Sequence, residues 1–406
     1  MQIPGGWLAD RYGGRWFCGG SILLTSTVSL LTPIAARTHI GILVSLRILA
    51  GIGLGTLFPS VQQLIVHWAQ PKYISTIVSI TISGADGGGV VGLLLSGFLC
   101  DYGFAGGWPS VFYVFGMIGC IWSVAWFLLC YNSPSTHPFI SKAERHFWEA
   151  EIGVAHPVDS AAVDRSPTPW GKIITSVPVW ALFVACFADE WGFLTILTCI
   201  PLFVHDVLGY NMSHNGIVSA VPFLLLIPLN PLCGYLSDWL RSSGRLSTNF
   251  VRKAFVVVGF AITGVSLSSV TYTGCYRVLA VLLLCTAATG ASMSYPTLMV
   301  TVHDMAPLHA GTLVGIMITA SCLAGIGSTL VVGEMTEQNS TREQWRIVFF
   351  ISAALYVVGA LVFVVFGTAD RQSWGEANAD VRETIITQQT TNNKLSANSA
   401  DSVDNM

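Results

Sequence analysis

The sequence predicts an all-α membrane protein that crosses the bilayer many times and is built from two related halves. Of its 406 residues, 52% are hydrophobic and only 10% are charged, and the mean hydropathy is +0.63. Soluble domains carry about 25% charged residues, so this charge deficit indicates a polytopic membrane protein. A short polar motif occurs once in each half, and each copy lies between apolar segments long enough to cross a membrane.

The repeated motif places acidic and basic residues at a predicted helix end. The first copy reads Gly-Gly-Trp-Leu-Ala-Asp-Arg-Tyr-Gly-Gly-Arg over residues 5–15, and the second reads Gly-Tyr-Leu-Ser-Asp-Trp-Leu-Arg-Ser-Ser-Gly-Arg over residues 234–245. An Asp can cap or pair near a helix end, Arg residues can hold that end at the membrane surface, and Gly permits a tight turn. We predict a gating motif made of Gly6, Asp10, Arg11, Gly14, Arg15, Gly234, Asp238, Arg241 and Arg245.

Ten apolar segments have roughly the 20 residues that one crossing requires. They fall at 18–36, 41–66, 76–100, 109–131, 179–202, 216–236, 252–271, 277–300, 310–333 and 347–367. The predicted organisation is an N-terminal helical half at 1–131, a Pro-rich polar linker at 132–178, a C-terminal helical half at 179–367 and a disordered cytosolic tail at 368–406.

The distribution of Lys and Arg predicts that the first motif lies on the cytosolic side. With that orientation, eleven basic residues fall in cytosolic loops and four in the opposite loops, which satisfies the positive-inside rule. Two Asn-x-Ser/Thr sequons, at Asn211 and Asn339, then lie in non-cytosolic loops and are predicted glycosylation sites.

The first motif resembles the loop between the second and third helices of the major facilitator superfamily, and the second copy lies where that family repeats it. Other stretches resemble its anion–cation symporter branch, which contains sialin, the vesicular glutamate transporters and the sodium–phosphate cotransporters. These stretches include residues 47–51, Phe58-Pro59, residues 107–113, residues 168–170 and residues 304–307.

The resemblance covers about residues 2–375. It implies a major facilitator fold, with two pseudo-symmetric six-helix halves around a central anion site that opens to each side in turn. It also implies that the sequence begins near the end of the second helix. We therefore expect about ten of the twelve helices, without the first and most of the second.

Arg47 is the predicted substrate-binding residue. A charged side chain inside a membrane helix costs roughly 2.5–3.5 kcal/mol on insertion scales, so it needs a reason to be there. Its guanidinium stays charged and offers a planar fork of donors to a carboxylate or phosphate. By resemblance, its position matches the Arg that binds the substrate anion. The alternatives are a structural partner for an acidic residue or a side chain that reaches the nearby membrane surface.

Asp86, Asp189 and Glu190 are predicted to tune the site or to couple ions. Asp86 lies in a Gly-rich stretch of the fifth helix, where the family does not usually have an acid. It could pair with Arg47, carry a proton or form a structural ion pair. For Asp189 and Glu190, the alternative is that one of them faces water and tunes nothing.

The resemblance also bears on the substrate and on coupling. Vesicular glutamate transporters carry a basic residue where this chain has Asp189, which implies a monoanion or a substrate with a cationic part. The chain is therefore expected to be sialin-like more than glutamate-transporter-like. Leu54 stands where the family often has a Glu tied to proton coupling, so one of the three acids has taken over or coupling differs.

No enzyme, metal or cofactor signature is present in the sequence. There is no phosphate-binding P-loop and no His-Glu-x-x-His, and the ten Cys form no Cys-x-x-Cys pair. The net charge of −3 gives no sign of a nucleic-acid partner.

The predicted function is secondary active transport of a small organic or inorganic anion, driven by a proton or sodium gradient. The expected protein is monomeric and resides in a lysosomal, vesicular or plasma membrane. The alternative is a non-transporting membrane scaffold or sensor, or a truncated transporter. The expected lack of helices and Leu54 favour that alternative, whereas the intact second motif and the polar residues of the core favour transport.

Overall fold

The computed structural model describes residues 1–134, 137–141, 143–144, 168–206, 212–273, 276–336 and 342–375, and within these residues every regular element is helical. The N-terminal half consists of α1 (Gln2–Tyr12), α2 (Gly14–Thr38), α3 (Ile40–Trp68), α4 (Ile74–Tyr102) and α5 (Trp108–Leu129). The C-terminal half consists of α8 (Val177–Asp206), α9 (Met212–Ser242), α10 (Thr248–Val270), α11 (Arg277–Met305), α12 (Ala310–Thr336) and α13 (Arg342–Phe366). Short elements are α7 (Trp170–Thr175) and the 3-10 turns η1 (Pro71–Tyr73), η4 (Pro307–His309) and η5 (Ser373–Gly375).

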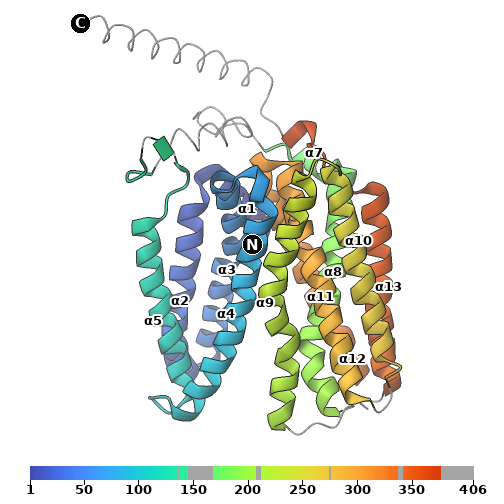
Figure 1. Cartoon of the computed structure of the whole chain (residues 1–406). Coiled ribbons are helices and arrows are strands. Elements are labelled where there is room, and N and C mark those ends of the chain that lie inside the picture. The colour runs from blue at the N-terminus through green and yellow to red at the C-terminus, as the bar shows by residue number, and fades with distance from the viewer. Residues whose placement is uncertain are drawn as a thin grey trace, which may run out of the picture.

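The predicted all-α polytopic fold is confirmed. Ten helices, α2–α5 and α8–α13, are long and apolar enough to cross a membrane. A helix satisfies its own backbone hydrogen bonds, which is why apolar segments of this length take that form in lipid. Figure 1 shows the two halves as two bundles side by side, α1–α5 in blue to teal and α8–α13 in green to red.

Corresponding turns in the two halves have the same construction. A single 3-10 turn with Pro at its start, η1 or η4, leads directly into α4 or α12. Within each motif a glycine with positive φ reverses the chain, Gly13 at 89° and Gly244 at 68°. The turn residue of the first motif is thus Gly13, which the sequence analysis did not single out, whereas Gly14 begins α2.

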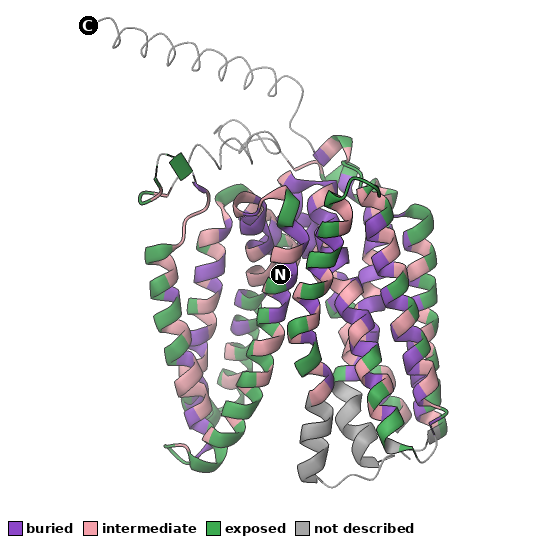
Figure 2. Cartoon of the chain, viewed as in Figure 1, coloured by how far each residue is buried: buried purple, intermediate pink, exposed green. Residues whose placement is uncertain are grey.

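The halves meet where α4 packs against α9 and where α1 and α3 pack against α12. Buried residues concentrate between the halves at the end that carries α1, η1 and η4, which we call the latched end (Figure 2). Buried residues make up 11–39% of the spans in α2–α5 and 28–56% of those in α8–α13. Among the described residues, the C-terminal half is therefore the more densely packed.

Part of the predicted tail is ordered. Thr368–Gly375 lie on the latched end, where the Gln372 backbone N donates to Met305 O at 2.9 Å. These residues are mostly polar, but their backbone N–H groups donate to acceptors in the folded bundle. The part of the chain with a defined structure therefore extends past residue 368, where the sequence predicted the tail to begin. Much of the predicted linker, and both Asn211 and Asn339, lie outside the described residues.

Candidate functional site

The first copy of the motif caps a helix of the opposite half. Asp10, near the end of α1, accepts hydrogen bonds from the Gly311 backbone N at 2.9 Å, the Thr312 backbone N at 2.7 Å and Thr312 Oγ1 at 2.6 Å. Gly311 and Thr312 begin α12, whose first amides have no partner within the helix. The carboxylate therefore joins the two halves by an N-cap supplied from a distant part of the chain. We call these contacts the first latch.

The second copy repeats this geometry in the opposite direction. Asp238, near the end of α9, accepts from the Ser75 backbone N at 3.3 Å, the Thr76 backbone N at 2.8 Å and Thr76 Oγ1 at 2.8 Å. These donors begin α4, and each lies 236 residues before its counterpart in α12. We call this set of contacts the second latch; together the two latches close the latched end across both seams.

Glycines in both motifs let the helices approach closely enough for the caps to form. A Cβ on Gly6 would collide with the Gly311 carbonyl, and a Cβ on Gly234 would collide with Ser79 Oγ. Each glycine lies one helical turn before its capping Asp. The Gly-x-x-x-Asp spacing thus combines a close helix crossing with a cap at the same interface.

The four motif arginines have different roles. Arg241 lies 3.7 Å from Asp238 and donates to the Pro71 carbonyl of the other half. Arg15 stays within its own half, where it donates to the Phe127 carbonyl and stacks on Tyr131. Arg11 and Arg245 are exposed, so the structure brings only Arg241 into a latch.

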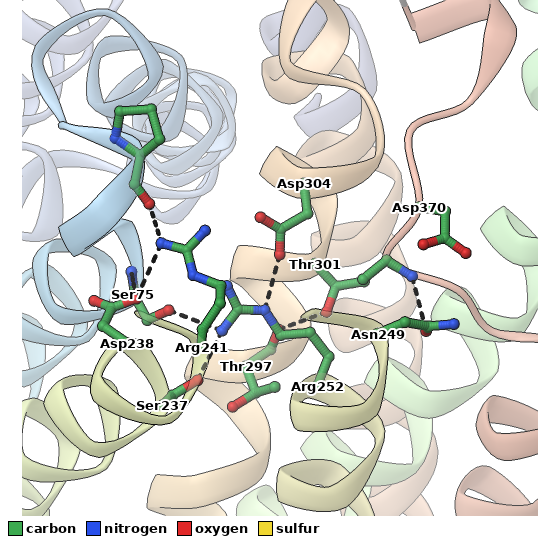
Figure 3. Close-up of polar contacts among 12 residues, drawn as sticks. Ser75, Ser237, Asp238, Arg241, Asn249, Arg252, Thr297, Thr301, Asp304 and Asp370 are labelled. Atoms are coloured by element: carbon green, nitrogen blue, oxygen red, sulfur yellow. Dashed lines mark hydrogen bonds and ion pairs between the residues drawn. The ribbon is translucent and has the colours of Figure 1, made fainter. Parts of the chain in front are cut away.

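A residue that sequence reasoning missed lies behind the second latch. Arg252 in α10 is fully buried and donates from Nε to Asp304 Oδ2 at 2.8 Å. Its Nη1 donates to Ser75 Oγ at 2.8 Å and to Ser237 Oγ at 2.7 Å (Figure 3). The guanidinium therefore joins α9, α10 and α11 to the first turn of α4. A basic side chain near a helix N-terminus is disfavoured by the helix dipole, and this was the sequence signal for a special partner.

The first latch has no such support. Among the described residues, no basic nitrogen lies within ion-pair distance of Asp10, and the carboxylate is buried against α12. Burial raises the pKa of Asp10 to about 7, although the hydrogen bonds from Thr312 and Gly311 oppose that rise. Asp10 lies outside the ten candidate spans, at the latched surface.

The seam between α4 and α9 continues from the second latch toward the middle of the bundle. Ser83 Oγ donates to the Ile227 carbonyl at 2.6 Å, and Asn230 Nδ2 donates to Asp86 Oδ2 at 2.8 Å. Asp86 therefore contacts the opposite half rather than Arg47. Its partner Asn230 is 144 residues away in sequence and was not predicted.

Asp189 and Glu190 are neighbours in α8 but lie in different environments. Asp189 is 1% exposed, accepts from Ser294 Oγ at 2.5 Å, and lies within the core of the C-terminal half. Glu190 is partly exposed, and the negative charge of Asp86 acts on its carboxylate. Of the two, Glu190 is the one near the seam between halves.

Arg47 is exposed along α3, and its guanidinium lies over the Phe112 ring at 5.2 Å from the centroid. Among the described residues it forms no ion pair, so the alternative of a structural acidic partner has no support there. Leu54 lies about two helical turns further along α3, on the same face as Arg47, and is also exposed.

A further link between the halves joins α3 to α11. Gln62 in α3 and His303 in α11 are both buried, and Gln62 Oε1 lies 2.8 Å from His303 Nε2. This bond connects the central helices of the two halves. In the described part of the chain, no group of three His, Cys, Asp or Glu side chains is arranged to hold a metal ion.

Comparison with known proteins places these features in a family. A model described as Major Facilitator Superfamily matches residues 1–329 and 243–395. The chain is 37% identical over 380 residues to "Uncharacterized transporter slc-17.2" of Caenorhabditis elegans, covering 93% of this chain and 76% of the relative. It is 36% identical over 375 residues to human vesicular glutamate transporter 2, covering 92% of this chain and 63% of the relative. A putative inorganic phosphate cotransporter of Drosophila ananassae is 32% identical over 396 residues, covering 97% of this chain and 81% of that protein.

Solved structures share the fold. The proton:xylose symporter XylE superposes with a TM-score of 0.66 at 16% identity, over 91% of this chain and 84% of that one. The transporter FucP in the outward conformation gives a TM-score of 0.62 at 12% identity, over 89% and 85% of the two chains.

Proposed function

Because this chain belongs to the major facilitator superfamily, as a multi-pass membrane transporter and not an enzyme, we propose that it carries a small anion across the membrane by alternating access. The observation that carries this proposal is Arg47. Arg47 lies in a membrane-crossing helix and has no acidic partner among the described residues. The N–H donors of its guanidinium can therefore bind an anionic ligand. The Phe112 ring supports the guanidinium from one side and leaves its donor edge available.

The acidic groups near the seam favour a monoanion or a zwitterion over a dianion. The negative charge of Asp86 acts on Glu190, and a second negative group on a substrate near them would be repelled by both carboxylates. A cationic part of the substrate would instead be attracted. We therefore place the substrate preference nearer to a sialin-like transporter than to the vesicular glutamate transporters, while phosphate remains in the test panel because of the Drosophila relative.

Glu190 and Asp86 are also our candidates for coupling to a proton or sodium ion. Asp86 joins the two halves through Asn230, so a cation that neutralises it acts on the seam itself. Asp189 is a weaker candidate, because Ser294 and the packing of the C-terminal half enclose it. Since one chain supplies both latches and the seam between them, we propose a monomer, with the latched end on the cytosolic side of a lysosomal, vesicular or plasma membrane.

The experiment is uptake into proteoliposomes with sialate, phosphate and glutamate, under an imposed proton or sodium gradient. Arg47→Gln should abolish gradient-driven uptake of the accepted anion. Arg47→Lys should retain weak uptake, because it keeps the charge and loses the bidentate fork. The matched control is Arg37→Gln, since Arg37 is exposed at the end of α2 and donates to the Ala105 carbonyl. No uptake of any anion by the wild-type chain would favour the non-transporting scaffold or sensor.

A further inference from the structure

One short turn of the C-terminal half supplies the donors of the first latch and supports the second latch through Arg252. Residues 304–312, which we call the latch turn, end α11, form η4 and begin α12. At one end, Asp304 holds Arg252, which donates to Ser75 beside the second latch. At the other end, Gly311 and Thr312 donate to Asp10 in the first latch. A shift of this turn therefore changes the geometry of both latches together.

The chain after α13 folds back onto this turn. Residues 368–375, which we call the strap, lie across the latched end beyond the end of α13 (Figure 1). The Gln372 backbone N donates to Met305 O at 2.9 Å, and the Ala369 backbone N donates to Asn249 Oδ1 at 3.2 Å. Asn249 lies in the first turn of α10, near Arg252, as Figure 3 shows.

The strap fits the turn closely. Met305 O belongs to the last residue of α11, where carbonyls have no partner within the helix, and the strap supplies one. A Cβ on Gly375 would lie 2.7 Å from Ala306 Cβ, so glycine is required for this approach. Trp374 is partly buried and packs against the hydrophobic core. Backbone bonds, a close contact and an aromatic anchor thus all act on the start of the latch turn.

We propose that the strap is a positioning element of the gate, which holds the latch turn where both latches can form and thereby favours the closed latched end. The hydrogen bonds from Gln372 to Met305 and from Ala369 to Asn249 attach the strap to the C-terminal half. The strap acts through the latch turn. Displacing it frees Met305 and Ala306, and the latch turn then loses the support that sets Asp304 and Thr312 in place. This inference rests on the alternating access of the proposed function, in which the repeated motif is the predicted gate.

The test is hydrogen–deuterium exchange of the full chain in lipid nanodiscs, without substrate. Peptides that contain the amides of Thr312 and Thr76 report the two latches. Trp374→Ala and Gly375→Val should each speed exchange in both peptides by about threefold or more, because local opening sets the exchange rate. The control is Ser373→Ala, which changes an exposed side chain of the same strap.

Truncations give a second, independent comparison. A chain that ends at residue 367 lacks the strap, whereas one that ends at residue 375 retains it. Only the shorter chain should show faster hydrogen–deuterium exchange at the latches. The melting temperatures of the two chains should agree within about 2 °C. A lower melting temperature of the shorter chain would instead indicate that the strap only stabilises the fold. Peptides from the middle of α13 should exchange alike in both.

Two results would overturn the inference. One is equal latch exchange in the 367 and 375 chains, and the other is faster exchange spread over all helices. Because exchange needs no substrate, the outcome is separate from the proposed transport. If the chain took up no anion but the strap variants showed faster latch exchange, the proposed transport would be wrong and the role of the strap would stand. If uptake were normal and latch exchange unchanged, the role of the strap would be wrong and the proposed transport would stand.

Discussion

The two latches share one hydrogen-bond pattern and differ in the charges around it. In each, an Asp accepts from the second and third backbone amides and from the Thr hydroxyl at the start of a helix in the opposite half. Asp238 has Arg241 at 3.7 Å and the Arg252–Asp304 pair behind it, whereas Asp10 has no cation within ion-pair distance among the described residues. At the fifth position of α2, where α10 has Arg252, the first half has the buried Cys18.

This difference distinguishes the hydrogen-bond pattern that both latches share from the charges that only one of them has among the described residues. The cap recurs in both latches, so backbone capping is the common mechanism that joins the halves. The charged network is present in the second latch alone among the described residues, so its contribution is specific to that seam. We therefore expect the second latch to be sensitive to loss of charge and the first to be sensitive to pH.

The largest expected effect comes from removing the buried cation of the second latch. Arg252→Met leaves Asp304 without its partner and two serine hydroxyls without a donor. Breaking a buried pair in this way costs about 3–5 kcal/mol, so a marked fall in melting temperature is expected. Differential scanning fluorimetry in detergent would measure it. Lys253→Met is the control, because Lys253 is its neighbour and, among the described residues, its Nζ donates to the exposed Val364 carbonyl. Similar losses in both variants would contradict the comparison.

The next effect concerns pH and the first latch. The pKa of Asp10 is raised to about 7 in the latched state, from an ordinary value of 3.8. The latched state therefore binds the proton more tightly. The stabilisation of the latched state by protonation of Asp10 is complete at a pH below 3.8, the ordinary pKa of an Asp. It is lost as the pH rises through about 7. Between pH 7 and 4, acidification should favour the latched state by about five- to tenfold per pH unit.

Single-molecule fluorescence energy transfer between labels on the exposed ends of α1 and α9 would follow that population. Asp10→Asn should remove most of the pH dependence, and Asp238→Asn, at the matching position of the second latch, is the control. A pH profile that survives in Asp10→Asn would assign the titration to another group.

Removing either cap should have an intermediate effect. Asp10→Ala and Asp238→Ala each leave helix-start amides unpaired, at a cost of about 0.5–2 kcal/mol. Exchange at the first turn of α12 should rise in the first variant, and exchange at the first turn of α4 in the second. If Asp10→Ala loosened only α4, the assignment of caps to helices would be wrong.

The smallest effect is expected from the partly exposed arginine. Arg241 is 19% exposed, and an ion pair in that setting contributes roughly 0.2–1 kcal/mol. Arg241→Gln should therefore lower the melting temperature far less than Arg252→Met. Raising the salt concentration should reduce the difference between wild type and Arg241→Gln, and a difference that salt leaves unchanged would point to the Pro71 contact instead.

The sequence carried the fold class, the ten spans and the positions of both latches, because hydrophobic length and a repeated motif are local signals. Asp10 and Asp238 were recognised since they recur with the same spacing from Gly6 and Gly234. The partners of these residues were not predicted. Thr312 and Thr76 are ordinary helix-start residues, and only the fold brings them to the carboxylates.

The remaining site residues depend on which face of a helix points inward. Arg252 and Lys253 are adjacent in sequence, yet one is fully buried and the other reaches the end of α13. Asp189 and Glu190 are also adjacent in sequence, yet Asp189 is buried and Glu190 is partly exposed. Asn230 meets Asp86 across 144 residues, a pairing that follows from the crossing of α4 and α9 rather than from either segment.

The Asp86–Asn230 bond has a mechanical consequence. It lies about 16 Å along α4 from Ser75 and about 24 Å from Tyr102, at 1.5 Å per residue. If the halves rock about this bond as a fulcrum, α4 behaves as a lever with unequal arms. A small displacement at the latches is then magnified about one and a half times at the far end. Shortening α4 between Asp86 and Tyr102 would then reduce the opening at the end opposite the latches, without changing either latch.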